Sequence, residues 1–226
     1  MARKQLNNLV LLALFVGLIF LLGQTPLGLI PLGWCNVTLL VIPVAIGTIY
    51  MGLKSGMVLG LAFGATSMVS ALIKPSVLVG TLMGSSPLAV VAMTFLPRLC
   101  IPLVIWGVYK LLAKKQKRLT VAMIIMLPLL SIPMLIWIVY RILVKKKKLP
   151  AEAAAAAVAA ACGSLTNTIL YLGLMLIFYM MAGIDNTAVL TAIGATAGGA
   201  GPCEAIAAAL ICPPILTALW RIRRQA

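Results

Sequence analysis

The sequence predicts an all-α polytopic membrane protein. Of its 226 residues, 63% are hydrophobic and only 9% are charged, which leaves too little polar side-chain area to cover a soluble domain. Most basic residues gather in clusters between long apolar runs, at Arg3-Lys4, Lys114–Arg118, Lys145–Lys148 and Arg221–Arg224. Because basic loops stay on the cytoplasmic side of a membrane, these clusters mark that side. We expect one transmembrane domain, residues 1–226, with both termini in the cytoplasm.

The apolar runs define six spans. A hydrocarbon core of about 30 Å and a rise of about 1.5 Å per residue set each span at about 20 residues. The expected spans are Leu6–Gly23, Val37–Met51, Ser55–Ile73, Leu88–Leu112, Ala151–Met181 and Pro202–Trp220. We expect the first span to be retained, because no cleavage site of small residues follows it.

The connecting segments differ from the spans in composition. Thr25–Asn36 and Pro75–Pro87 are rich in Gly, Pro or Ser, so we expect both to be loops on the outer side. Thr187–Gly201 is rich in small residues and is expected to be irregular or re-entrant.

One further apolar segment, at about 119–146, has basic clusters on both sides. If it crossed the membrane once, the basic clusters after it would lie outside. If it enters and returns, every basic residue except Lys74 and Arg98 faces the cytoplasm. We therefore expect a re-entrant or surface hairpin between the fourth and fifth spans, with a turn in Leu127–Pro133. Seven full spans are the alternative.

Composition also excludes several functions. The net charge of +15 is explained by the topology and by contact with anionic lipid, so we expect no nucleic-acid partner. The chain has no His and three acidic residues. This composition argues against a His metal site and a hydrolytic site, and we expect no cofactor and no enzymatic activity.

Two charged residues lie within predicted spans. A charge at this depth costs about 2.5 to 3.5 kcal/mol on insertion scales and indicates a functional site. Arg98 lies in the fourth span and Glu204 in the first turn of the sixth. Either they contact a polar substrate or they pair with each other.

Other polar groups lie nearby. Thr166 and Asn167 are in a polar turn at the middle of the fifth span, and Trp34, Asn36 and Thr38 are at the outer end of the second. We interpret all five as candidate substrate contacts. Hydrogen bonding between helices and an interfacial Trp are the alternatives.

A pair of small residues four apart, Ala13 and Gly17, marks one face of the first span. Such a face allows a second helix to approach closely.

The order of these segments resembles a known family. The segments that carry the likeness are Leu12–Gly17, Val37–Val44 with Gly47, Met51–Gly56, Gly60–Gly64, Pro97-Arg98, Gly163–Thr168, Glu204–Ile206 and Pro213–Ile215. Together they resemble the S component, the substrate-binding subunit, of energy-coupling factor (ECF) transporters. The likeness covers nearly all of the chain except about 119–146.

This resemblance implies a function. Such a protein lies in a prokaryotic plasma membrane, binds a vitamin from outside and docks on a transmembrane T component that two cytoplasmic ATPases drive. Ala13 and Gly17 would form the docking face. The likeness around Thr38–Val44 favours pantothenate, whose carboxylate Arg98 could bind, and an S component for cobalamin, riboflavin or folate is an alternative. A stand-alone secondary transporter or channel is the main alternative, and a membrane scaffold is another.

Overall fold

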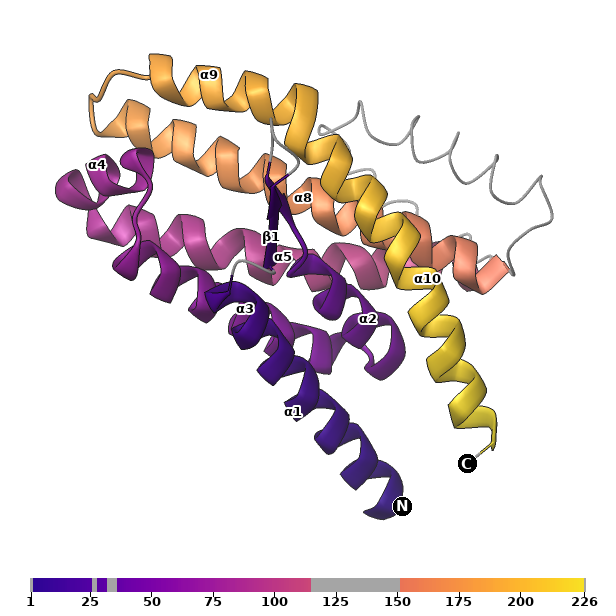
Figure 1. The fold of residues 1–226 in the computed structure, drawn as a ribbon. Coiled ribbons are helices and arrows are strands. Elements are labelled where there is room, and N and C mark those ends of the chain that lie inside the picture. The colour runs from indigo at the N-terminus through magenta and orange to yellow at the C-terminus, as the bar shows by residue number, and fades with distance from the viewer. Residues whose placement is uncertain (1, 26–27, 32–35, 115–150, 226) are drawn as a thin grey trace.

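The computed structural model describes residues 2–25, 28–31, 36–114 and 151–225. The helices are α1 (Ala2–Gln24), α2 (Val41–Met51), α3 (Leu53–Ile73), α4 (Val77–Ser85), α5 (Pro87–Lys114), α8 (Ala151–Met181), α9 (Thr187–Ala195) and α10 (Gly201–Gln225), with a π-helical turn, η4 (Thr196–Ala200), between the last two. Two short strands, β1 (Leu29–Pro31) and β2 (Asn36–Thr38), pair antiparallel with Leu29 opposite Thr38. Figure 1 shows α9 continuing through η4 into α10.

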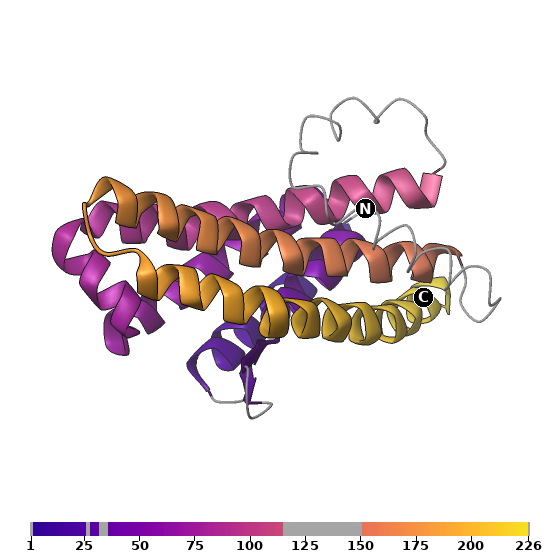
Figure 2. The same cartoon turned by 90° about the horizontal axis from the view of Figure 1, so that it is seen from above.

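The predicted all-α membrane fold is confirmed. In the described part of the chain, four helices are long and apolar enough to cross a membrane: α3, α5, α8 and α10. The apolar part of α1, Asn8–Gln24, is shorter. The two small strands form a hairpin that projects from the side of the helices near the junction of α9 and α10 (Figure 2).

The prediction that Val37–Met51 forms one membrane-spanning helix is wrong. Its first residues belong to β2, and α2 has only 11 residues, or about 16 Å at the helical rise. Every residue from Val41 to Thr48 is buried, so α2 lies inside the protein. Gly52, with φ of 96°, joins α2 directly to α3. A side chain is strained at that φ, and glycine is not.

Both predicted loops contain regular structure. Pro75–Pro87 holds α4, whose first turn is capped by the hydroxyl of Ser76 accepting from the N–H of Val79. Thr25–Asn36 contains β1 and the start of β2. The segment Thr187–Gly201 is helical, and its irregularity is limited to η4. The hairpin expected at 119–146 lies outside the described residues.

Small residues bring the central helices together. Helix α8 packs against both α5 and α10, and Ala153 to Ala160 are almost completely buried. Farther along α8, a Cβ on Gly163 would lie 2.5 Å from the side chain of Ile105 on α5. This close packing fixes α5, α8 and α10 relative to one another, and these three helices carry most of the polar residues described below.

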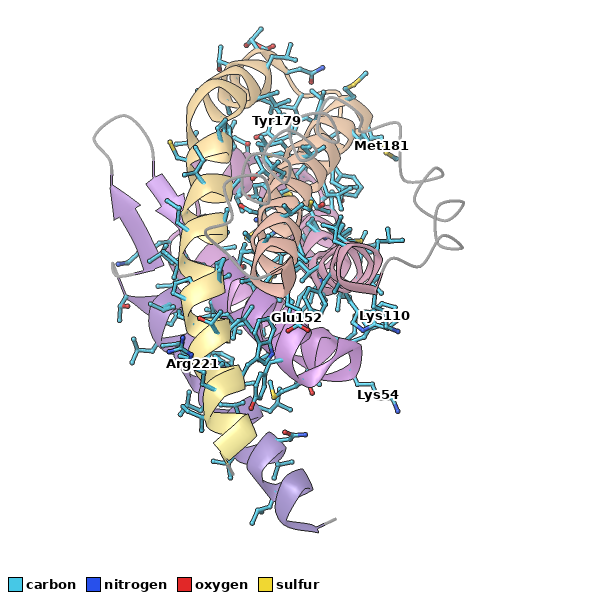
Figure 3. The ribbon with its side chains drawn as sticks, turned by 90° about the vertical axis from the view of Figure 1, so that its right-hand side faces the viewer. Lys54, Lys110, Glu152, Tyr179, Met181 and Arg221 are labelled. Carbon is cyan, nitrogen blue, oxygen red and sulfur yellow. The ribbon has the colours of Figure 1, made fainter. Side chains whose placement is uncertain are left out.

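The two termini lie at the same end of the molecule (Figure 1). Figure 3 views the molecule from the right-hand side of Figure 1, the side on which both termini lie, and there Lys54, Lys110, Glu152 and Arg221 project from α3, α5, α8 and α10. The basic residues that open α1 and close α5 and α10 are therefore at one end of the structure. This arrangement agrees with the charge pattern in the sequence.

The close packing of α8 leads to a stability prediction. Replacing Ala157, which is 1% exposed, by Leu adds volume between tightly packed helices and should cost about 1–3 kcal/mol. We expect a lower thermal unfolding temperature in detergent for Ala157→Leu. Ala218→Leu, at an exposed position of α10, is the matched control and should leave it unchanged. Equal unfolding temperatures for the two variants would contradict this role of α8.

Candidate functional site

A cavity of about 510 Å³ lies between β2 and helices α5, α8, α9 and α10. Its lining residues are Thr38, Arg98, Asn167, Thr168, Tyr171, Leu172, Ala195, Thr196, Ala200 and Glu204. The volume is that of a pocket for a small organic ligand. Among the described residues, no group of three or more His, Cys, Asp or Glu side chains could hold a metal ion.

The position of Arg98 follows from the proline before it. Proline has no N–H, so Pro97 cannot donate to the carbonyl oxygen of Met93 as a residue in an α-helix normally does. Nη1 of Arg98 donates to that oxygen instead, at 3.0 Å. Pro97 thus leaves the Met93 oxygen without its usual backbone donor, and the guanidinium of Arg98 takes that donor's place.

Two aromatic rings hold the same guanidinium. Its central carbon lies 4.7 Å from the centroid of Tyr171 on α8 and 5.4 Å from that of Phe63 on α3, both within cation–π range. Helix α3 reaches this point because of a glycine: a Cβ on Gly60 would lie 2.7 Å from the backbone oxygen of Arg98. The charge is therefore fixed from α3, α5 and α8 together.

Arg98 forms no ion pair with any described residue. The interpretation that Arg98 and Glu204 pair directly therefore does not hold, although both line the cavity. The Nε atom of Arg98 is buried and has no hydrogen-bond partner in the described part of the chain. Glu204 lies in the same cavity but forms no direct ion pair with Arg98, so an anionic ligand that bonds the guanidinium would stabilise this site.

Glu204 joins three elements. The backbone N–H of Thr38 in β2 donates to its Oε1 at 2.9 Å, and the Thr168 hydroxyl of α8 donates to its Oε2 at 3.4 Å. Glu204 itself lies in the first turn of α10. Its carboxylate therefore fixes the hairpin against the side of the cavity, at the place where Figure 2 shows the hairpin beside α10.

The polar turn of α8 divides into two faces. Asn167 and Thr168 line the cavity, and Oδ1 of Asn167 is buried without a partner among the described residues. The hydroxyl of Thr166 instead donates to the backbone oxygen of Cys162 at 2.7 Å, and Thr166 is not a lining residue.

The π-helical turn shapes the opposite wall. In an α-helix, residues four apart are rotated by about 40° from one another, so a row of them drifts around the axis. The N–H of Gly201 bonds to the oxygen of Thr196, five residues earlier. This wider turn reduces the drift and lets Thr196, Ala200 and Glu204 line one cavity. Single π-helical turns are frequent at functional sites.

The structure brings together four of the residues predicted to contact a substrate: Thr38, Arg98, Asn167 and Glu204. Trp34 lies outside the described residues, as does the side chain of Asn36. Thr168 belongs to the polar turn that the sequence singled out, and sequence reasoning missed Tyr171, Leu172, Ala195, Thr196 and Ala200. Of these, Tyr171 had a usable signal, because it lies four residues after Asn167 and so shares its helix face.

The model of the family described as "ECF transporter, substrate-specific component" matches residues 7–126, slightly more than half of the chain. The chain belongs to the ECF substrate-specific components. No curated protein matches it. As an S component, it is a substrate-binding subunit of a membrane transporter rather than an enzyme.

The match divides the site of this S component into two parts. Thr38 and Arg98 fall within the matched residues, and Asn167, Tyr171 and Glu204 lie after them. The cavity therefore combines a part of the chain that the family model describes with a part that it does not.

The Pro-Arg pair of α5 leads to a prediction. In Pro97→Ala, the new N–H donates to the Met93 oxygen and displaces the guanidinium. Because a hydrogen bond to a charged group contributes about 1.5–3 kcal/mol, we expect ligand affinity to fall about tenfold or more. Pro102→Ala on the same helix is the control, since its N–H faces the Arg98 backbone oxygen. Equilibrium binding measures both, and equal effects would contradict the proposed role of Pro97.

Proposed function

We propose that this S component binds a vitamin with a carboxylate, most specifically pantothenate, from the outer side of a prokaryotic plasma membrane. It then delivers the vitamin inward as part of a complex with a transmembrane T component and two cytoplasmic ATPases. The observation that carries this proposal is the buried guanidinium of Arg98, which lines a cavity of ligand size and has no ion-pair partner among the described residues.

The position of the cavity supports binding from outside. Arg98, Tyr171 and Glu204 lie in those halves of α5, α8 and α10 that are farther from the end with the two termini. Lys54, Lys110 and Arg221 project on the side where the termini lie, which the positive-inside rule assigns to the cytoplasm. With this orientation, both termini are cytoplasmic and the cavity is closer to the outer surface.

The chemistry of the cavity supports pantothenate among the vitamins considered. A guanidinium binds a carboxylate with two parallel hydrogen bonds, and pantothenate has one carboxylate. Its hydroxyl and amide groups match the polar side chains of Asn167, Thr168 and Thr196. Cobalamin, riboflavin and folate are the competing ligands to be tested.

Helix α1 supplies a surface for the T component. Ala13 and Gly17 are exposed, and a Cβ on Gly17 would meet no atom within 4 Å. They lie on the side of α1 opposite Phe15 and Ile19, which are buried in the protein core. A small, open face of this kind allows close approach of a helix from another subunit.

Transport in reconstituted vesicles tests the function. Vesicles with the S component, the T component and the ATPases should accumulate labelled pantothenate only when ATP is supplied on the cytoplasmic side. Vesicles with the S component alone should bind the vitamin without accumulating it. Uptake by the S component alone would instead indicate a secondary transporter or channel, and the proposal would be wrong.

Substitution on α1 tests the docking face. In Gly17→Trp, the indole ring prevents close helix approach, so we expect the T component to be lost on co-purification while ligand affinity is unchanged. Leu103→Trp on α5, at a position 47% exposed, is the control and should retain the complex. Co-purification of the T component with Gly17→Trp would show that it docks elsewhere.

A further inference from the structure

The cavity contains two buried side chains whose hydrogen-bonding needs are opposite. Arg98 is 9% exposed and Asn167 is 8% exposed, and both line the cavity. Nε of Arg98 and Oδ1 of Asn167 have no partner among the described residues. A buried donor or acceptor without a partner destabilises the protein, and a ligand that supplies the partner recovers the lost free energy.

Each side chain selects one chemical group. The guanidinium is a cation with unused donors, so it requires an anionic acceptor, and its planar fork matches a carboxylate. Oδ1 of Asn167 is an acceptor and requires a hydroxyl or an amide N–H. The Glu204 carboxylate has two bonds from Thr38 and Thr168 and retains further acceptor positions on the same side of the site.

The guanidinium of Arg98 and the side chain of Asn167 lie at different heights along α8. The guanidinium lies against the ring of Tyr171, which is four residues, or about 6 Å of helix, after Asn167. A ligand that contacts both side chains therefore has its carboxylate about one helical turn from its donor.

The charges of the cavity limit the anion to a single charge. In the described lining, Arg98 is the one basic residue and Glu204 is the one acidic residue. A phosphate ester would add a second negative charge beside Glu204 without a second cation, and this repulsion is strong in a buried site. The cavity thus favours a monoanion.

The lining also disfavours a flat aromatic ligand. Tyr171 is the one aromatic residue among the described lining residues, and the guanidinium of Arg98 already stacks on its ring. The other walls are short or aliphatic, with Leu172, Ala195 and Ala200. They offer no second ring for the stacking that planar ligands use.

We infer that the ligand is a small, non-aromatic monocarboxylate with a hydroxyl or amide donor about one helical turn from the carboxylate, and that Arg98 and Asn167 bind these two groups. The inference rests on the proposed function and assigns the chemical class of the substrate and the residues that select it.

Four ligands distinguish the contribution of the carboxylate from that of the hydrogen-bond donor, by equilibrium binding to the purified full-length protein. Pantothenate has the carboxylate and the donors, pantothenol has the donors alone, lipoate has a carboxylate without other donors, and riboflavin is flat and has no carboxylate. We expect pantothenate to bind most tightly, pantothenol and lipoate each at least about tenfold more weakly, and riboflavin most weakly.

Variants then assign each group to its residue. Arg98→Gln should weaken pantothenate about 10- to 100-fold and pantothenol less than about threefold. Asn167→Leu should weaken pantothenate about 5- to 10-fold and leave lipoate unchanged. Arg98→Lys, which retains the charge, should recover part of the pantothenate affinity. Thr191→Val, at an exposed position of α9 whose hydroxyl bonds its own helix, should change nothing.

Three outcomes would overturn the inference: pantothenol binding as tightly as pantothenate, riboflavin binding more tightly, or neither carboxylate binding. Equal loss of both pantothenate and pantothenol in Arg98→Gln would also overturn it, because Arg98 would then act only on the fold. In each case, continued co-purification of the wild-type protein with the T component and ATPases would leave its role as an S component standing and would withdraw only the carboxylate substrate. Loss of that assembly would contradict the function itself.

Discussion

The rest of the site depends on how one positive charge is held inside an apolar bundle. A guanidinium at this depth is costly in a membrane protein, and Arg98 has no ion-pair partner among the described residues. Three contacts hold it in place: the backbone oxygen of Met93, which Pro97 leaves without a backbone donor, and the rings of Phe63 and Tyr171. These contacts are neutral, so they fix the position of the charge without compensating it. We propose that the bound substrate supplies an anion in direct contact with the guanidinium.

Glu204 holds the other side of the cavity by the opposite means. Its carboxylate accepts hydrogen bonds from β2 and α8, so a negative charge fixes the hairpin to two helices. Arg98 therefore has an N–H donor left for a ligand, whereas Glu204 uses its carboxylate oxygens to bond other parts of the protein. This division explains how the same cavity can hold two opposite charges without an ion pair between them. The alanine-rich start of α8 supports both, because it keeps α5 and α10 close to α8.

The sequence predicted the long helices well, because a run of about 20 apolar residues has few structures other than a span. Ala151–Met181 was predicted with the bounds that α8 has. Val37–Met51 was not, since an uninterrupted apolar run does not distinguish a span from a strand followed by a short buried helix. Polar residues such as Arg98 and Asn167 were found because they interrupt apolar runs. Leu172, Ala195 and Ala200 have no such contrast, and only the packing of α8 against α9 and α10 brings them to the cavity.

A high-resolution structure of the protein with the ligand that co-purifies with it would test the role of Arg98 most directly. We expect an acidic group of that ligand within hydrogen-bond distance of the guanidinium, with the bond to the Met93 oxygen retained. A ligand that occupies the cavity while Arg98 contacts only Met93, Phe63 and Tyr171 would show that the charge serves the fold and does not select the substrate.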